Sequence, residues 1–332
     1  MTSKNLSRRA FVAASGLGAG ALALSACGCS GNVKPISLVL DYAPNVNHTG
    51  IYVALSKGYF ANEKVDVEIL PVPEDGSDAL IGSGGADMGF TYQDYLANNL
   101  TSDAPMPYTA VAAVVQHNTS GIMSRMEDGI KTPKGLENHK YATWNLPIEQ
   151  ATIKQIVEAD GGDFSKVKMV PYTVDDEVIG LRGNLFDAVW VYKWWAVQNA
   201  KLQGYSVNYF GFADVDPVFD YYTPVLAVND AFAAENPEKV KAFLRAAKRG
   251  YEFAAENPDE AAAILCNAVP ELDKGLAKAA QESISAEYIS DADSWGVIDP
   301  TRWAKFYQWL NDKKLVAHEL DVNAGFTMDY LS

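Results

Sequence analysis

Aromatic side chains are concentrated where two apolar stretches of the sequence end. Tyr42 follows the apolar run at 36–40, and four aromatic residues lie within the six positions 190–195. A planar heteroaromatic ligand needs flat faces on both sides and a few polar groups in its plane. We expect two of the four rings at 190–195 to line a ligand site, with Trp190 equally suited to the core. The aromatic candidates are Tyr42, Trp144, Trp190, Tyr192, Trp195 and Tyr222.

Polar residues that could bind the edge of such a ring lie near the same positions. Asp94 could accept a hydrogen bond from an exocyclic amine, and such charge-assisted bonds are strong. The alternative is that Asp94 stabilises a helix N-terminus. His48 could equally cap a helix, and Asn118 and Thr119 suit a turn as well as a ligand. The polar candidates are Asn45, His48, Gln93, Asp94, Asn118 and Thr119.

The common catalytic and metal-binding patterns are missing from the sequence. It contains no Gly-x-Ser-x-Gly elbow, no phosphate loop and no paired-histidine metal motif, and its four histidines are widely spread. Of the three cysteines, Cys27 and Cys29 are too close to form an unstrained bridge, and Cys266 lies among Ala and Leu. We therefore expect no enzymatic activity, no cofactor and no metal.

Short strand-like runs alternate with helical stretches in β-α-β-α-β order, and this order occurs twice. The expected strands are at 36–40, 65–69 and 86–90 in the first unit and at 141–144, 167–170 and 186–191 in the second. This order predicts an α/β fold with mostly parallel sheets flanked by helices. Tyr42 then lies at the carboxyl end of the first strand, where α/β proteins bind their ligands.

Two such units followed by a helical tail predict two lobes, between which the chain crosses twice. We place the crossings near 120–127 and 216–224. The expected first lobe comprises residues 33–122 and 223–332, and the second comprises residues 123–222. Lobes of this kind close on a ligand by a hinge motion.

The first 26 residues have the pattern of an export signal. Arg8 and Arg9 precede the uncharged stretch 10–26, which is rich in Ala, Gly and Leu and too short for a comfortable membrane span. The arginine pair resembles a twin-arginine signal, and the sequence ending in Cys27 resembles a bacterial lipobox. The alternative is a weak N-terminal helix with a chance cysteine.

The expected product of this signal is a lipid-anchored protein. We predict removal of residues 1–26, lipidation at Cys27 and a short linker at 27–32. Two or more acyl chains hold a soluble domain at a bilayer. The predicted location is therefore the outer face of the cytoplasmic membrane, with the lipid as the only membrane contact.

The strongly acidic composition excludes some partners. The chain has 27 Lys and Arg against 42 Asp and Glu, a formal net charge of −15. Removing residues 1–26 removes Lys4, Arg8 and Arg9 and no acid, which leaves 24 − 42 = −18. This charge argues against nucleic acid as a partner and against binding to anionic lipid by charge alone.

Several stretches resemble the NMT1/THI5-like family of substrate-binding proteins, which bind pyrimidine precursors of thiamine. They are 40–48, 50–60 (GIYVALSKGYF), 81–89, 92–94, 229–243, 295–296 and 302–310. The resemblance implies a two-lobed periplasmic-binding fold of type II-like form, with a ligand cleft between the lobes. It also implies the permease and ATPase subunits of an ABC importer as partners of a monomeric binding protein.

The sequence departs from the family at four places. The related synthases carry a cofactor-binding lysine where this chain has Gly85, and a cysteine-rich run where it has residues 219–222. Both differences argue against synthase chemistry and against pyridoxal phosphate. Bacterial pyrimidine binders commonly have Trp in place of Tyr42, and a Trp-rich segment ending in Glu where this chain ends in Ala196.

The resemblance and the residues together predict an exported binding lipoprotein for a small aromatic heterocycle. The expected ligand is a thiamine-precursor pyrimidine of the hydroxymethyl or formylamino type, stacked between Tyr42 and Trp195, with Gln93 and Asp94 at its edge. One alternative ligand is a flavin, and another is a sulfonate bound by Arg125 or Arg182. An alternative class is a pyrimidine-processing enzyme on the same fold.

Overall fold

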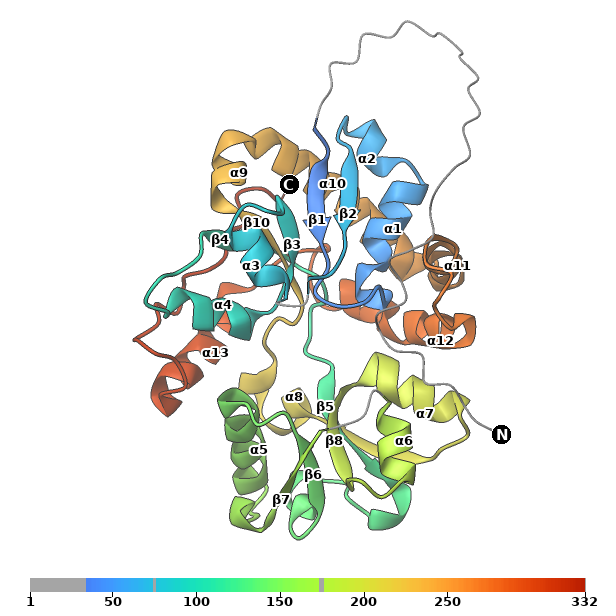
Figure 1. The fold of residues 1–332 in the computed structure, drawn as a ribbon, viewed down its shortest axis with the longest axis vertical. Helices are drawn as coiled ribbons and strands as arrows, with labels where there is room; N and C mark the ends of the chain where they lie inside the picture. Colours follow the sequence, from blue (N-terminus) through green and yellow to red (C-terminus); the bar gives the residue numbers. More distant parts are fainter. Residues whose placement is uncertain (1–33, 74–75, 173–175, 332) are drawn as a thin grey trace, which may run out of the picture. The chain divides into compact units, whose positions relative to one another are not determined.

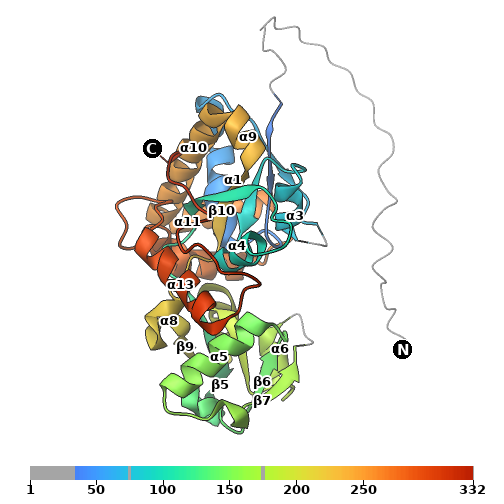
Figure 2. The same ribbon diagram turned by 90° about the vertical axis from the view of Figure 1, so that its left-hand side faces the viewer.

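The computed structural model describes residues 34–73, 76–172 and 176–331. The expected signal peptide, the linker at 27–32 and Cys27 lie outside these residues. The described chain contains two five-stranded sheets, each with helices on both faces (Figures 1 and 2). This arrangement confirms the α/β fold with two lobes that the sequence predicts.

The first sheet is built from the beginning of the chain and one late strand. Its order is β2 (Val67–Leu70), β1 (Ile36–Val39), β3 (Met88–Thr91), β10 (Val225–Asn229) and β4 (Tyr108–Ala113). Strand β1 pairs in parallel with β2 and β3. Strand β10 pairs antiparallel with both β3 and β4, so the other four strands run in one direction.

The second sheet repeats this pattern. Its order is β7 (Lys168–Pro171), β6 (Lys140–Thr143), β8 (Ala188–Tyr192), β5 (Ser120–Arg125) and β9 (Val207–Gly211). Here β5 is the antiparallel strand, between β8 and β9. The predicted crossing at 120–127 therefore needs correction, because its first six residues are a buried strand paired on both sides.

Helices follow most strands, as expected for β-α-β units. With the first sheet lie α1 (Thr49–Ser56), α2 (Tyr59–Asn62), α3 (Ser77–Gly82) and α4 (Gln93–Leu100). With the second lie α5 (Pro147–Ala159), α6 (Glu177–Arg182), α7 (Gln198–Leu202) and α8 (Phe212–Val215). After β10 come α9 (Asp230–Glu235), α10 (Pro237–Glu256), α11 (Pro258–Ala268), α12 (Lys274–Ile284) and α13 (Pro300–Lys313).

Helices α1 and α10 cross in direct backbone contact. A Cβ atom on Gly250 would lie 1.9 Å from the carbonyl oxygen of Gly50, and a Cβ on Gly50 would lie 2.2 Å from the Tyr251 ring. Glycine at both positions is therefore required for this approach. The crossing fixes the start of α1, and with it the loop that leads from β1 into α1.

Two buried tyrosines donate hydrogen bonds to the backbone carbonyls of that loop. The hydroxyl of Tyr251 donates to the carbonyl of Asn47 at 2.7 Å, and the hydroxyl of Tyr288 donates to the carbonyl of Val46 at 2.6 Å. Both rings belong to the apolar core under the first sheet. The loop at 45–48 is thus anchored by side chains that come from the C-terminal helices.

In the described part of the chain, no helix combines the length and the apolar composition that a membrane crossing requires. The described residues also contain no cluster of three or more His, Cys, Asp or Glu side chains suited to a metal ion. Cys266 is a buried free thiol.

Candidate functional site

The site begins where β1 ends, with a buried pair between Asp41 and His48. Nε2 of His48 lies 2.7 Å from Oδ1 of Asp41, and the two side chains are 0% and 3% exposed respectively. Nδ1 of the same ring accepts a hydrogen bond from the backbone N–H of Asn45 at 3.1 Å. The ring also stands edge-on to Phe90, with centroids 4.7 Å apart. His48 is therefore fully occupied by the protein itself.

Asp41 is held as a carboxylate in this setting. Burial acts to raise its pKa, but hydrogen bonds from His48 and from Tyr92 outweigh burial and hold the pKa below its ordinary value. Tyr92 directly follows β3, so the two residues come from neighbouring parallel strands. Burial and the nearby Asp41 charge raise the pKa of Tyr92 well above its ordinary range.

A second carboxylate, Asp94, lies in the first turn of α4. Burial raises the pKa of Asp94 to about 6, although its oxygens accept hydrogen bonds from the backbone N–H groups of Asp94 and Tyr95. The sequence left a helix-stabilising role and a ligand role open, and both fit this geometry. The negative charge of Asp94 adds to burial in raising the pKa of Tyr95 and of Tyr221.

The second sheet contributes Tyr192, the last residue of β8. Its hydroxyl lies 3.2 Å from Oγ1 of Thr223, just before β10 of the first sheet. Burial raises the pKa of Tyr192, and the charges of Asp94 and Asp41 raise it further. Tyr192 therefore joins the carboxyl end of the second sheet to Thr223 and feels the charges of both carboxylates of the first sheet.

Three of the predicted aromatic residues have side chains that are at least partly exposed to solvent. Tyr42 is 69% exposed and Trp144 is 44% exposed. Trp144 lies at the carboxyl end of β6, with its ring 6.0 Å from that of Trp190. Trp195 is half-buried in the turn after β8, where it packs against the core of the first sheet.

Two other predicted aromatic residues are core residues. Trp190 is buried and meets Phe212 edge-to-face at 4.3 Å. Tyr222 is buried against Trp303, and its hydroxyl accepts a hydrogen bond from the backbone of Asp299 at 2.8 Å. The neighbour of Tyr222, Tyr221, is also buried, and its ring stacks on Phe306 with centroids 4.0 Å apart.

Three of the predicted polar residues use their side chains for hydrogen bonds to backbone groups. The amide of Gln93 donates to the carbonyl of Trp303 at 3.0 Å and accepts from the N–H of Tyr222 at 2.9 Å. Asn45 caps the 3₁₀ turn before α1 by accepting from the N–H of Asn47. Asn118 donates to the carbonyl of Phe219 and accepts from Ser120. Their amides brace the loops around the site.

Thr119, together with the neighbouring Asn118, lines a cavity of about 320 Å³ near the first chain crossing. Its hydroxyl oxygen is buried and has no hydrogen-bond partner, while its carbonyl accepts from Tyr209 at 2.8 Å. The cavity is also lined by Lys193 of the second lobe and Glu287 of the C-terminal part.

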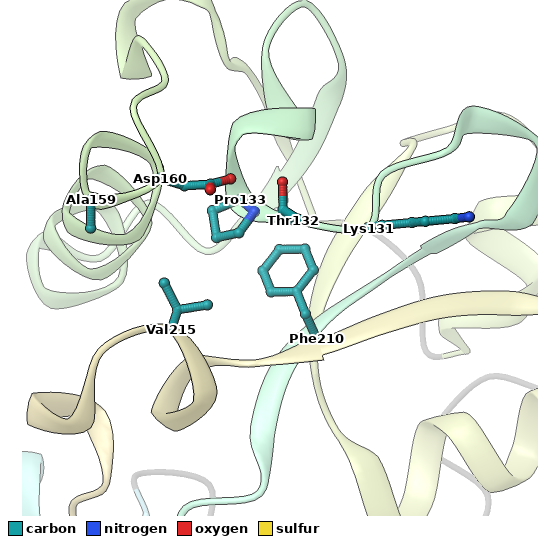
Figure 3. Close-up of a pocket in the computed structure, with 7 residues that line it drawn as sticks. All are labelled: Lys131, Thr132, Pro133, Ala159, Asp160, Phe210 and Val215. Atoms are coloured by element: carbon teal, nitrogen blue, oxygen red, sulfur yellow. The ribbon is translucent and has the colours of Figure 1, made fainter.

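Another cavity, of about 280 Å³, lies within the second lobe (Figure 3). Pro133, Phe210 and Val215 face it, beside Asp160 at the end of α5. None of the predicted site residues lines it.

Sequence reasoning missed three residues near this site: Asp41, Tyr92 and Tyr95. The signal for Asp41 and Tyr92 was available, since Asp41 directly follows the strand predicted at 36–40 and Tyr92 lies two residues after the strand predicted at 86–90. Asp41 adjoins the predicted site residue Tyr42, and Tyr92 adjoins the predicted site residue Gln93.

The family of the chain follows from a direct comparison. The model of the family described as NMT1/THI5 like matches residues 45–261, which is more than half of the chain. The chain belongs to the NMT1/THI5-like family. The matched region of this family member includes the loop at 45–48, the whole of α4 and the second sheet.

Two curated relatives of this NMT1/THI5-like protein have different activities. A formylaminopyrimidine-binding protein from Halalkalibacterium halodurans is 30% identical, over 84% of this chain and 85% of the relative. The 4-amino-5-hydroxymethyl-2-methylpyrimidine phosphate synthase of Aspergillus parasiticus is 26% identical, over 90% of this chain and 87% of the relative.

A solved structure has the same fold. The periplasmic aliphatic sulphonate binding protein SsuA from Escherichia coli superposes with a TM-score of 0.68 at 14% identity, covering 89% of this chain and 97% of SsuA. The NMT1/THI5-like protein thus has the fold of periplasmic binding proteins. Family and fold together support a solute-binding protein.

Proposed function

We propose that this protein is an extracytoplasmic solute-binding protein of an ABC importer, and that it binds a thiamine-precursor pyrimidine between its two lobes. The observation that carries the proposal is the contact between the two sheets at Tyr192, whose hydroxyl lies 3.2 Å from Oγ1 of Thr223 and whose pKa is raised by burial and by the charges of Asp94 and Asp41. A ligand held there would meet aromatic rings and two hydrogen-bond acceptors. An aminopyrimidine offers a flat ring and N–H donors, which match both features.

The relative that binds formylaminopyrimidine supports this choice of ligand. Tyr42 and Trp195, with Trp144 as a third ring, are the proposed stacking residues. Asp94 is the proposed partner of an exocyclic amine. Gln93 is not carried into the proposed site, because the backbone of Tyr222 and Trp303 uses both ends of its amide.

A sulfonate is a poorer fit to the same residues, although the fold is shared with a sulphonate binding protein. Arg125 is buried and pairs with Asp128 at 2.7 Å and with Asp187. Arg182 donates to the carbonyl of Gln203 at 2.8 Å on the surface of the second lobe. Neither arginine contacts the candidate site, where an anion would instead meet two carboxylates.

A synthase activity is disfavoured by the residues that stand in place of the family's lysine and cysteines. Gly85 is packed so that a Cβ would lie 2.6 Å from the side chain of Leu80. Phe219 and Tyr222 are core residues in the second replaced segment. We therefore propose binding without chemical turnover.

The export signal at 1–26, the lipidated Cys27 and the importer subunits remain parts of the same proposal. Mass spectrometry of the membrane-associated protein tests the anchor directly. An acylated N-terminal peptide beginning at Cys27 supports it, and an unmodified N-terminus at another position contradicts it.

A thermal-shift screen tests the ligand class. The panel contains aminopyrimidines, thiamine, nucleobases, riboflavin and alkanesulfonates. A ligand at about 100 times its dissociation constant adds about 2.7 kcal/mol to the free energy of unfolding, which raises Tm by a few degrees. A shift with aminopyrimidines alone supports the proposal, and a shift with sulfonates alone contradicts it.

A further inference from the structure

The two chain segments that connect the sheets are joined to each other by hydrogen bonds. The chain passes from the first sheet to the second at 114–119, between β4 and β5, and returns at 212–224, between β9 and β10. The backbone N–H of Asn118 donates to Oδ1 of Asp220 at 3.0 Å, and the Asn118 amide donates to the carbonyl of Phe219 at 2.8 Å. Any rotation of one lobe against the other must bend these two crossings.

His117, in the first crossing, lies between two carboxylates. Its Nδ1 is 2.8 Å from Oδ2 of Asp220 in the second crossing, and its Nε2 is 3.1 Å from Oδ1 of Asp291 in the segment that leads to α13. A carboxylate only accepts hydrogen bonds, so both ring nitrogens must donate. Only the imidazolium carries a proton on each nitrogen, so this geometry requires a positively charged His117.

Arg302 completes the network from α13. Its guanidinium lies 3.6 Å from Oδ2 of Asp220 and 3.6 Å from Oδ2 of Asp291, and it donates a hydrogen bond to the carbonyl of Gln116. The side chains of Arg302 and Asp220 are largely buried, whereas that of Asp291 is exposed. Two cations and two carboxylates therefore tie both crossings to the C-terminal part of the first lobe.

This network forms part of the wall of the cavity of about 320 Å³ that Thr119 lines. His117 and Asp220 line the cavity together with Glu287 of the first lobe. The second lobe contributes side chains to the same cavity: Lys193, Tyr209 and Asp214. Because the walls belong to both lobes, a hinge motion must change the shape of this cavity. The network thus lies where the lobes move against each other.

The charged groups around His117 act on its pKa in both directions. The hydrogen bond with Asp220 is the largest influence and raises the pKa, and the charges of Asp220 and Asp291 raise it further. Burial and the charge of Arg302 lower it, and the net result is a pKa above the ordinary value. The other charged groups that line the cavity beside His117 are Lys193, Asp214 and Glu287.

We propose that His117, Asp220, Asp291 and Arg302 form a pH-sensitive hinge latch, in which protonated His117 holds both crossings against the first lobe and limits the relative movement of the lobes. A neutral imidazole donates from one nitrogen only, so loss of the proton leaves one carboxylate without its hydrogen bond. The latch is fully formed below about pH 6.5 and is lost as the pH rises through the higher pKa of the folded protein. This inference goes beyond the proposed function, because it concerns the hinge and holds whatever ligand is bound.

Nitrogen-15 NMR of the His117 ring tests the charged form. Both nitrogens are expected to be protonated at mildly acidic pH, with a titration midpoint above the ordinary value of about 6.5. Asp291→Asn should lower this midpoint, and because Asp291 is exposed the variant should still fold. Asp103→Asn, which removes the carboxylate beside the exposed His318, is the matched control and should leave it unchanged. A wild-type midpoint at or below the ordinary value would overturn the latch.

Small-angle X-ray scattering of the ligand-free protein tests the effect on the hinge. The radius of gyration is measured about one pH unit below and one above the midpoint, and we expect it to be larger at the higher pH. His117→Gln, uncharged at both, should have the larger value throughout. His318→Gln is the matched control outside both crossings and should behave as the wild type does. A radius of gyration that does not change with pH in the wild type, or that changes equally in His117→Gln, would overturn the proposal.

Discussion

The imidazole of His48 and the carboxylate of Asp41 form a buried hydrogen-bonded pair, 2.7 Å apart, where β1 turns toward α1. Nε2 of His48 is used by Asp41 and Nδ1 by the backbone N–H of Asn45, so both ring nitrogens of this predicted ligand contact bind the protein itself.

The first prediction concerns stability. His48→Ala leaves the Asp41 carboxylate buried with one partner fewer, which should cost about 3–5 kcal/mol of unfolding free energy near neutral pH. His48→Gln should cost less, because an amide can accept from Asn45 and donate to Asp41. Urea unfolding measures both. Equal losses for the two variants would contradict the proposed role of the hydrogen bonds.

The stability lost in His48→Ala should become smaller as the pH falls. The pKa of Asp41 is below its ordinary value in the folded protein, so its contribution to stability is present near neutral pH. The contribution is lost as the pH falls through the folded-state pKa, below the ordinary carboxyl value of about 4. The stability difference between wild type and His48→Ala should therefore narrow in that acidic range.

The contribution of Asp94 to folding stability changes with pH in the opposite direction. Its pKa is raised to about 6, so burial of this carboxyl favours the folded state at low pH and the benefit disappears as the pH rises through about 6. Asp94→Asn should match wild type in stability near pH 4 and exceed it by ~1 kcal/mol near pH 8. Unfolding curves at the two pH values test this difference.

The raised pKa of Asp94 also predicts how the affinity for the ligand changes with pH. If Asp94 accepts from an exocyclic amine as a carboxylate, affinity should fall as the pH drops through about 6. Asp94→Asn should bind more weakly near pH 8 and lose this pH dependence. A wild-type affinity that is constant across this range would exclude Asp94 as the charged acceptor.

Tyr42→Ala separates binding from folding. The ring is 69% exposed, so its removal should leave Tm nearly unchanged. Affinity for a planar ligand should fall by about 1–3 kcal/mol, the scale of ring stacking with burial. Trp195→Ala should lower affinity by a similar amount and should also lower Tm, because Trp195 packs against the first core. Unchanged affinity in both variants would contradict the stacking model.

Gly250→Ala tests the helix crossing that supports the site. The added methyl group would lie 1.9 Å from the carbonyl oxygen of Gly50, which forces α10 away from α1. We expect a loss of about 3 kcal/mol or more in unfolding free energy. Gly275→Ala is a matched control on α12, because its Cβ would meet only a side-chain oxygen of Asp273 at 3.2 Å. Similar stability of the two variants would contradict the close crossing.

Periodicity predicted the fold well because it reports which faces of a strand or helix are buried. The alternating and apolar runs at 65–69 and 186–191 became β2 and β8 of two mostly parallel sheets. The crossing at 120–127 was wrong because Ser120 and Ser124 look polar in sequence. Both side chains are buried and satisfied locally, by Asn118 and by the carbonyl of Ile130.

The site was harder to predict because residue type does not reveal which hydrogen bonds are already made. Gln93 lies next to Tyr92, yet the backbone of Tyr222 uses its amide. Tyr221 and Tyr222 are identical in type, and only the fold decides that Tyr221 stacks on Phe306 while Tyr222 packs against Trp303. Such differences depend on contacts between residues that are far apart in the sequence.

The central claim is that the carboxyl ends of the two sheets bind an aminopyrimidine. The most direct measurement is a calorimetric titration of a hydroxymethyl- or formylamino-substituted aminopyrimidine into purified protein that has been unfolded and refolded to remove any bound solute. We expect saturable binding with one ligand per chain, and weaker or absent binding of an alkanesulfonate. Saturable binding of the sulfonate with no response to the aminopyrimidine would contradict the account.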